Sequence, residues 1–371
     1  MTAALREEEE LMMSEEQQKG AGAGMGMGRL LHENESGADA KAKLEDQMPI
    51  LATPNEKHPK RQNAGNMMHL FKRNSSFDFT NLLDEDQKLA SLLRPCSRKK
   101  LLRCRVVRMR GLVGSYPILE MHLDGAPGVP DDKTLLLCAR KRKKSKSSYY
   151  LISTKRDELT RESDGYIAKL RGNILGSEYT LYRRSRDTDE NVGEGEELLV
   201  IKYRQTVMRK EGGPREMTAI FTDPSFTHHP NANKDLLAYY KELKEASKSG
   251  LKPGQAESEK AQPPLVVLRS LEPQWREDLQ SYVLDFKGRV TEASVKNFVM
   301  EESSVMKPTN SNVVDSVTPT EEGRLSKRKE VVIFGKRGKN EFSLDMACPC
   351  SILQAFALAI ASTDFKMVNS L

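Results

Sequence analysis

Two cations stand two residues apart in the segment YIAKLR, residues 166–171, whose pattern is typical of a β-strand. Alternation along a strand sends successive side chains to opposite faces, so Lys169 and Arg171 should share one face about 6–7 Å apart. We expect Tyr166, Ala168 and Leu170 on one face and Ile167, Lys169 and Arg171 on the other. Arginine binds a phosphate through two parallel hydrogen bonds, and lysine adds a point charge. The spacing therefore suits adjacent phosphates of one ligand, although such pairs are more often solvated surface.

A second basic feature is the run RKRKKSK at residues 140–146. Its cations are Arg140, Lys141, Arg142, Lys143, Lys144 and Lys146. Three interpretations stay open, and they do not exclude one another: a solvated loop, a nuclear localisation signal, and attraction to an anionic membrane. Each basic residue close to such a membrane contributes about 1 kcal/mol. Beside the strand at 166–171, the run would supply a second and nonspecific membrane signal.

No other constellation points to chemistry. Cys348 and Cys350 flank a proline without a second pair at metal-ligand spacing, so packing is the favoured role. His228 and His229 are adjacent in a polar loop. No serine, histidine and aspartate arrangement, phosphate-cradling glycine loop or paired acids stand out. We therefore expect no enzyme, no metal and no cofactor.

The composition sets the class of protein. Only 37% of the 371 residues are hydrophobic and 30% are charged, which predicts a sizeable disordered fraction. The net charge of +6 is modest. Five cysteines without regular spacing favour a reducing compartment, and the acidic N-terminal stretch lacks the apolar core of a secretory signal. We expect a cytosolic or nuclear protein that is not secreted and has no transmembrane segment.

Residues 1–94 are predicted to form a disordered arm, because they are polar and include the low-complexity stretch GAGAGMGMG. Two short segments within them, 5–18 and 77–93, have helical character. Each is either a partner-binding helix or a transient helix in a linker. We expect order to begin near Pro95.

Residues 95–371 are predicted to form one mainly β domain. Short segments rich in valine, isoleucine, leucine and tyrosine alternate with glycine, proline and charged residues, a pattern typical of antiparallel sheets. The predicted strands include 103–107, 134–138, 149–153, 179–182, 198–203 and 216–221. Two long loops interrupt the pattern, at about 231–264 with a helical patch (KDLLAYYKELKEA) and at about 301–329.

The segment SILQAFALAIAS, residues 351–362, is apolar on nearly every side of a helix. Such a helix must be enclosed. It is too short to cross a bilayer, which takes about 20 apolar residues. Since the preceding segments read as strands, we expect a closed or strongly curved sheet around it.

Several segments, in order, resemble the C-terminal domain of the Tubby family. They are LLLCARKRKKSKSSYYLIS (135–153), DGYIAKLRGNILGSEYTLY (164–182), GPREM (213–217), QSYVLDFKGRVTEASVKNF (280–298) and FSLDMACPCSILQAFALAIASTDFK (342–366). The last two resemble the family's signature regions. The resemblance implies a closed barrel of about twelve mostly antiparallel strands around a central hydrophobic C-terminal helix.

The resemblance also implies a function. Family members bind phosphatidylinositol 4,5-bisphosphate, and their Lys-x-Arg pair falls on Lys169 and Arg171. It implies a non-enzymatic membrane adaptor, peripheral at the plasma membrane, that directs membrane-protein cargo to the cilium. The N-terminal arm would bind the intraflagellar transport complex. The alternative is a nuclear DNA-binding transcription regulator released from the membrane, although no recognition helix or zinc module is visible.

The sequence departs from the family pattern at two pocket positions. A family asparagine falls on Tyr149, and a family arginine falls near Gly195 or Glu196, within the acidic stretch GEGEE. Losing a cation and gaining carboxylates should weaken binding or change which phosphates are preferred. Compensation could come from Arg183, Arg184 or Arg186.

Overall fold

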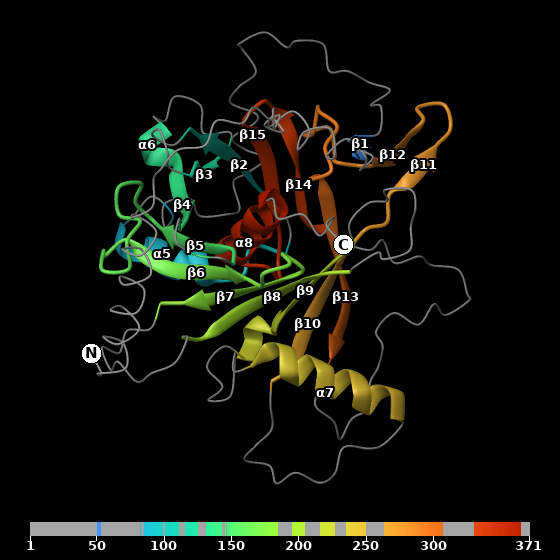
Figure 1. Ribbon diagram of the computed structural model, residues 1–371, viewed down its shortest axis with the longest axis horizontal. Helices are drawn as coiled ribbons and strands as arrows, with labels where there is room; N and C mark the ends of the chain where they lie inside the picture. Colours follow the sequence, from blue (N-terminus) through green and yellow to red (C-terminus); the bar gives the residue numbers. More distant parts are fainter. Residues whose placement is uncertain are drawn as a thin grey trace, which may run out of the picture. The chain divides into compact units, whose positions relative to one another are not determined.

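Twelve antiparallel strands close into one barrel in the computed structural model of the chain (Figure 1). The structure describes residues 50–52, 82, 85–98, 101–110, 116–124, 131–142, 145, 147–184, 195–204, 216–226, 235–249, 263–306 and 330–364. This confirms the mainly β fold class predicted from the sequence.

The barrel strands follow the chain order with one detour. They are β2 (Leu102–Met109), β3 (Ile118–Leu123), β4 (Leu135–Lys141), β5 (Tyr149–Ser153), β6 (Tyr166–Gly172), β7 (Glu178–Arg183), β8 (Glu197–Tyr203), β9 (Met217–Thr222), β10 (Leu265–Ser270), β13 (Phe298–Met306), β14 (Glu330–Gly338) and β15 (Glu341–Met346). Neighbours from β2 to β10 pair in sequence order, and β10 then pairs with β13. The pairing of β15 with β2 closes the ring.

Helix α8 (Ile352–Thr363) runs inside the barrel, as the enclosed apolar segment predicts. Every side chain from Ile352 to Ser362 is buried except that of Gln354, which is partly exposed. The Ser351 hydroxyl accepts a hydrogen bond from the Gln354 backbone N–H, and the Gln354 side chain accepts one from the Ser351 N–H. This capping box satisfies two of the backbone groups that a buried helix start would leave without partners.

The other end of α8 is fixed to the barrel wall by Asp364. Its carboxylate accepts hydrogen bonds from Lys141 Nζ at 2.7 Å, Tyr150 Oη at 2.8 Å and Tyr179 Oη at 3.0 Å. Burial alone would raise the pKa of Asp364, but hydrogen bonds, led by the one from Lys141, hold the pKa below its ordinary value. The carboxylate is therefore charged and fully engaged.

The folded part begins earlier than the sequence analysis predicts. Helix α5 (Glu85–Leu93) contacts α8, and Leu82 and Leu92 are buried in the main core. Strand β1 (Ile50–Ala52) pairs in parallel with β12 (Ser281–Leu284), which also pairs with β11 (Gln274–Arg276). Helix α5 lies within the segment 77–93, whose helical character the sequence indicates, and both α5 and β1 are ordered although they precede the boundary expected near Pro95. The predicted helix at 5–18 lies outside the described residues.

The predicted loops are partly correct. Helix α7 (Leu236–Ser249) forms within the loop at 231–264 and packs on β8 and β9. The loop expected from residue 301 begins later, because β13 continues to Met306 in pairing with β10. Two short helices also occur among the described residues, α6 (Asp131–Thr134) and the 3-10 helix η2 (Pro224–Phe226). None of the described helices is both long and apolar enough to cross a bilayer.

Candidate anion-binding site

Lys169 and Arg171 lie on the outer face of β6, with Lys169 partly exposed and Arg171 exposed. Between them, Leu170 points into the main core, as alternation requires. Arg171 is opposite Tyr149 of β5, and Lys169 is opposite Tyr182 of β7. The outer face of these three strands therefore places two cations between two tyrosines.

The predicted faces are wrong for the start of β6. Tyr166 pairs with Ser153 and Ala168 pairs with Ile152, so Ile167 is an extra residue at a β-bulge. Ile167 consequently packs in the main core rather than beside the two cations. Tyr166 moves to the outer face, where it packs with Tyr149 and Leu151. The bulge thus adds an aromatic side chain to the cationic face.

Tyr149 is the centre of this cationic face. Its ring centroid lies 5.3 Å from the guanidinium carbon of Arg142, 5.4 Å from that of Arg161 and 5.9 Å from that of Arg171. The Tyr149 hydroxyl also accepts a hydrogen bond from Arg161 Nε at 3.0 Å. Lys169 Nζ lies 5.0 Å above the ring of Tyr182. Aromatic faces attract cations, so the two tyrosines hold positive charge together without neutralising it.

The surroundings of Lys169 disfavour its charged form. Burial, followed by the charges of Arg171 and Arg161, lowers its pKa from 10.5 to about 8. Among the described residues, no carboxylate forms an ion pair with Lys169. A lysine in this setting would gain stability from a bound anion, because the anion would supply the missing opposite charge.

The two departures from the family pattern have different consequences. Tyr149 is buried, and it replaces an amide with a ring that contacts arginines. Glu196 forms an ion pair with Arg183 at 3.4 Å, and Glu197 accepts a hydrogen bond from the Leu236 N–H at the start of α7. Both carboxylates are therefore engaged by groups other than Lys169.

The expected compensating arginines are also engaged within the chain. Arg183 pairs with Glu196, and Arg184 donates a hydrogen bond to the Ser163 carbonyl at 2.9 Å and lies over the Tyr166 ring. Arg186 lies outside the described residues. The sequence analysis overlooked Arg161, which lies in the connection between β5 and β6. Arg161 acts on the pKa of Lys169 and contacts the same tyrosine ring as Arg171. Nothing in its local sequence distinguishes it from the other charged residues of that loop.

The basic run at 140–146 does not act as one surface. Lys141 points into the barrel and pairs with Asp364, with only 13% of its side chain exposed. Arg140 donates a hydrogen bond to the Leu159 carbonyl at 3.5 Å. Arg142 contacts Tyr149 on the outer face. Lys143, Lys144 and Lys146 lie outside the described residues, so their membrane role stays a prediction.

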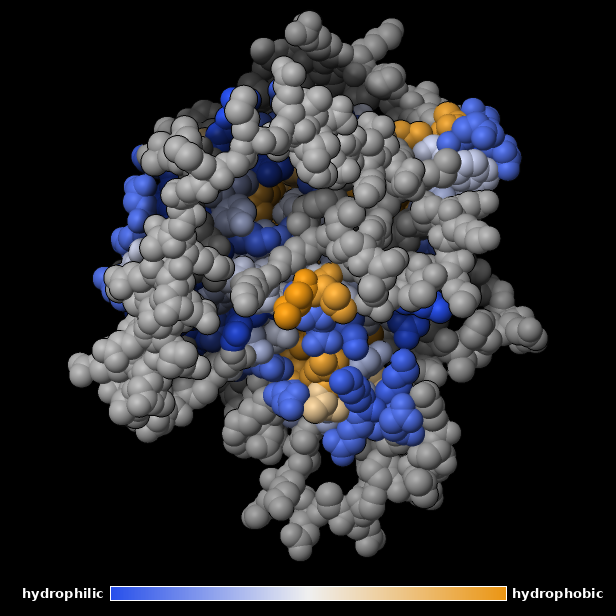
Figure 2. Space-filling view, viewed as in Figure 1, coloured by the Kyte–Doolittle hydropathy of each residue, from blue (hydrophilic) through white to orange (hydrophobic). Residues whose placement is uncertain are grey.

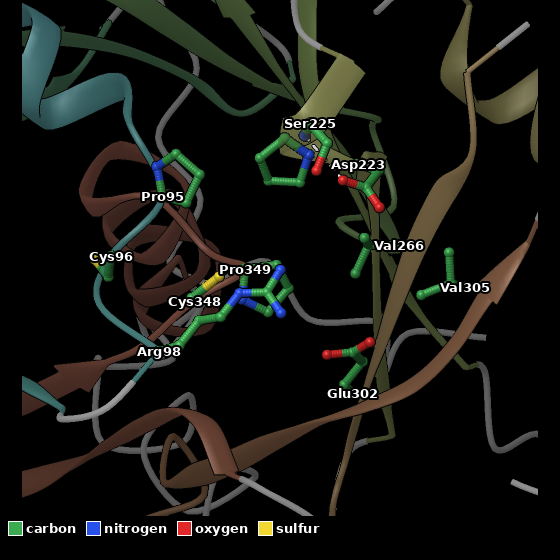
Figure 3. A pocket seen from close by; sticks show the side chains of 11 residues that line it. Pro95, Cys96, Arg98, Asp223, Ser225, Val266, Glu302, Val305, Cys348 and Pro349 are labelled. Carbon is green, nitrogen blue, oxygen red and sulfur yellow. Dashed lines mark hydrogen bonds between the residues drawn. The ribbon is translucent and has the colours of Figure 1, made fainter. Parts of the chain in front are cut away.

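A pocket of about 550 Å³ lies at the start of α8 (Figure 3), and no residue of β6 is among its lining residues. Its lining includes Arg98, the acids Asp223 and Glu302, and two cysteines, Cys96 and Cys348. Burial raises the pKa of Cys96 to about 12, so its thiol is neutral and a poor nucleophile. No group of three metal-ligating side chains occurs among the residues that the structure describes. The pocket thus combines mixed charges without the convergence seen around Tyr149.

Comparison with known proteins matches residues 92–365 to the model of the Tub family. Tubby protein homolog 1 from Caenorhabditis briggsae is 32% identical over 305 residues, covering 78% of this chain and 62% of that protein. Tubby-related protein 3 from Mus musculus is 32% identical over 287 residues, covering 74% of this chain and 53% of that protein. Protein king tubby from Drosophila persimilis is 32% identical over 278 residues, with 74% and 53% covered. The matches span about half to three fifths of these relatives.

Proposed function

The chain belongs to the Tub family, and on this premise we propose that it is a non-enzymatic adaptor that binds phosphoinositide headgroups at an anionic membrane. The ligand is phosphatidylinositol 4,5-bisphosphate. Lys169 and Arg171 are its binding residues, and the barrel is the scaffold that holds them on one rigid strand.

One observation carries this proposal: Lys169 is a partly buried lysine next to two arginines, with no carboxylate partner among the described residues. Such an arrangement destabilises the free protein slightly, because like charges repel and burial disfavours the ammonium. A phosphorylated headgroup would relieve both costs. Arg171 would bind one phosphate through its fork of donors, while Lys169 would contact the adjacent phosphate.

The environment of Tyr149 bears on headgroup choice. Its hydroxyl already accepts a hydrogen bond from Arg161, and its ring contacts Arg171. Arg161 thus places a third cation beside Lys169 and Arg171. In the family pattern, the third cation is an arginine near the position of Gly195 or Glu196. We expect this rearrangement to retain binding while changing the preference among phosphate positions.

Liposome flotation with defined phosphoinositides tests the proposal. The double variant Lys169→Ala/Arg171→Ala should lose about tenfold or more in affinity for vesicles that contain phosphatidylinositol 4,5-bisphosphate, since about 1 kcal/mol is lost per basic residue and the phosphate hydrogen bonds are lost as well. The chain offers a matched control in a second Lys-x-Arg pair. Lys202 and Arg204 form ion pairs with Glu178 and Glu216, so Lys202→Ala/Arg204→Ala should retain most of the specific binding.

Equal binding to phosphatidylserine vesicles of the same charge would contradict a specific site. Equal losses in the two double variants would contradict the assignment to Lys169 and Arg171. Retention on DNA at high salt without lipid preference would favour the alternative of a transcription regulator. Ciliary trafficking and the intraflagellar transport partner remain predictions from the family, and co-precipitation from ciliated cells with and without residues 1–49 tests them.

A further inference from the structure

The turn between β6 and β7 exposes two large apolar side chains. Figure 2 shows one face of the molecule, on which the described surface is mostly hydrophilic and apolar surface is confined to small patches. Among the described large apolar residues, Ile174 is the most exposed at 72%, and Leu175 follows at 51%. They are adjacent, so the turn presents a single apolar tip.

The turn is held in shape by Asn173 and Gly176. The Gly176 N–H donates a hydrogen bond to the Asn173 carbonyl at 3.2 Å, which places Ile174 and Leu175 at the two central positions of a turn. The Asn173 side chain accepts a hydrogen bond from the Ser177 N–H at 2.9 Å, and Gly176 has a φ of 68°, which suits glycine. The apolar pair is therefore displayed by a formed turn.

The base of this turn is anchored to the core. Gly172 packs against the Tyr179 ring so closely that a Cβ there would lie 2.7 Å from a ring carbon. Tyr179 in turn donates its hydrogen bond to Asp364 at the end of α8. The base of the turn is thus linked through Tyr179 to the end of the central helix.

The order of charged and apolar residues from β6 to the tip matches the order of phosphates and acyl chains in a lipid leaflet. Ile174 is three positions beyond Arg171 in the chain, which spans at most about 10 Å, and Lys169 lies about 7 Å farther back along the strand. An apolar group that enters the boundary between headgroups and acyl chains goes about 5–10 Å deep. With the tip at that depth, Arg171 would lie among the lipid phosphates and Lys169 among the phosphates of a protruding headgroup.

Basic side chains lie near the base of the turn. Ser148 accepts a hydrogen bond from the Gly172 N–H at 2.7 Å, so the connection from β4 to β5 reaches the base of the turn. Arg142 begins that connection and donates its backbone N–H to the Tyr149 carbonyl at 2.8 Å. Positive charge near the base of an exposed apolar tip matches an anionic bilayer better than an apolar protein groove.

We propose that Ile174 and Leu175 form a membrane-inserting tip, which enters the acyl boundary of an anionic leaflet while Lys169 and Arg171 hold a headgroup. This proposal rests on the proposed function and adds a second contact of different chemistry. It makes vesicle binding tighter than binding of the same headgroup in free solution.

The first test separates the two contacts. The variant Ile174→Ser/Leu175→Ser should bind soluble inositol 1,4,5-trisphosphate within about twofold of wild type in calorimetry. Its partition onto vesicles that contain phosphatidylinositol 4,5-bisphosphate should fall about 10- to 100-fold, as expected for removing two apolar side chains from a buried position. The control is Phe226→Ser, because Phe226 is 42% exposed and follows the residues that line the pocket at the start of α8. It should leave both measurements unchanged.

The second test locates the tip directly. The chain has one tryptophan, Trp275, so the variant Trp275→Phe/Leu175→Trp reports only on the tip. Its emission should shift to shorter wavelength on vesicles with the phosphoinositide and be quenched by lipids brominated on their acyl chains. An unshifted emission from a vesicle-bound protein would overturn insertion.

The outcomes distinguish the two proposals. Unchanged vesicle partition in the serine variant would overturn the tip while leaving the headgroup site intact. Equal loss of soluble headgroup binding would also overturn it, because the turn would then act on the site itself. Failure of the wild type to bind either the soluble headgroup or the vesicles would overturn the proposed function and the tip together.

Discussion

Two pairs of neighbouring residues lie on opposite faces of the same barrel wall. Lys141 and Tyr150 point inward and both donate hydrogen bonds to Asp364. Arg142 and Tyr149, one residue away in each case, lie outside, with the guanidinium carbon of Arg142 5.3 Å from the centre of the Tyr149 ring. The chain thus uses the same two residue types, a cation and a tyrosine, on both sides of the wall.

The difference between the two faces is the presence of a carboxylate. On the inner face, Asp364 neutralises Lys141 and fixes the end of α8. On the outer face, Tyr149 and Tyr182 gather cations, and Lys169 has no carboxylate partner among the described residues. Neutralised charge stabilises the barrel on the inner face, whereas the Lys169 ammonium on the outer face has no carboxylate partner among the described residues.

The largest effect should follow from breaking the inner pair. Asp364→Asn leaves the Lys141 ammonium, 13% exposed, without a carboxylate and should lower the free energy of unfolding by about 3–5 kcal/mol. Urea unfolding measures it. Glu216→Gln serves as the control, because it breaks the exposed pair with Arg204 and should cost less than about 1 kcal/mol. Equal costs would contradict the prediction that the buried pair stabilises the barrel more than an exposed pair does.

A smaller loss of stability should follow from adding a methyl group at Gly172, where the β6–β7 hairpin packs against the core. Gly172→Ala would place a methyl group 2.7 Å from the Tyr179 ring, and overpacking of this kind costs about 1–3 kcal/mol. Gly338→Ala is a matched control, because its new methyl group would meet only the Glu341 Cβ, at 4.0 Å. Thermal unfolding compares the two variants, and a Gly172 variant as stable as the Gly338 variant would speak against the close packing.

The outer face should respond to pH through Lys169. Since its pKa is about 8, the charge that attracts an anion is present at pH 7 and lost as pH rises to 9. Losing about 1 kcal/mol of attraction corresponds to about fivefold weaker headgroup binding. The variant Lys169→Arg keeps its charge over this range and corrects for titration of the phosphates. Parallel pH profiles for wild type and variant would exclude Lys169 as the titrating group.

The smallest effect concerns stability at the same residue. The folded pKa of Lys169 lies below the unfolded value of 10.5, so the folded state binds this proton more weakly. The protonated form of Lys169 therefore destabilises the folded state. The free energy of unfolding should rise as the pH increases from about 8 to 10.5. Lys169→Met should remove this gain, with a difference under about 1 kcal/mol because water screens the partly exposed group. Urea unfolding at pH 7 and pH 10 measures it, and a variant less stable than wild type at pH 7 would contradict the prediction.

The sequence predicts those features that depend on local periodicity. The apolar segment at 351–362 indicates an enclosed helix, and α8 confirms it. The strand predicted at 149–153 coincides with β5. The position of Lys169 and Arg171 on one outer face also follows from alternation, since both lie beyond the bulge at Ile167.

Other features depend on partners that are distant in sequence. Lys141 sits in a run of exposed-looking cations, and only Asp364, 223 residues away, explains its inward position. The bulge at Ile167 inserts one residue and so reverses the faces of Tyr166 and Ile167, which periodicity alone cannot reveal. Helix α5 falls within the segment 77–93, whose helical character the sequence indicates, but its place in the core depends on contact with α8.

The threading of α8 through the barrel also sets an order of events during synthesis. All twelve barrel strands precede α8 in the chain, and β2 must wait for β15 before the ring can close. Ribosomes add about 5–20 residues per second, so the inner faces of the early strands are without their core helix for many seconds. Pairings between such distant strands are also slow to form. The growing sheet therefore exposes the apolar side chains of its inner face. Chaperones that bind extended apolar strands should bind it until α8 has been synthesised.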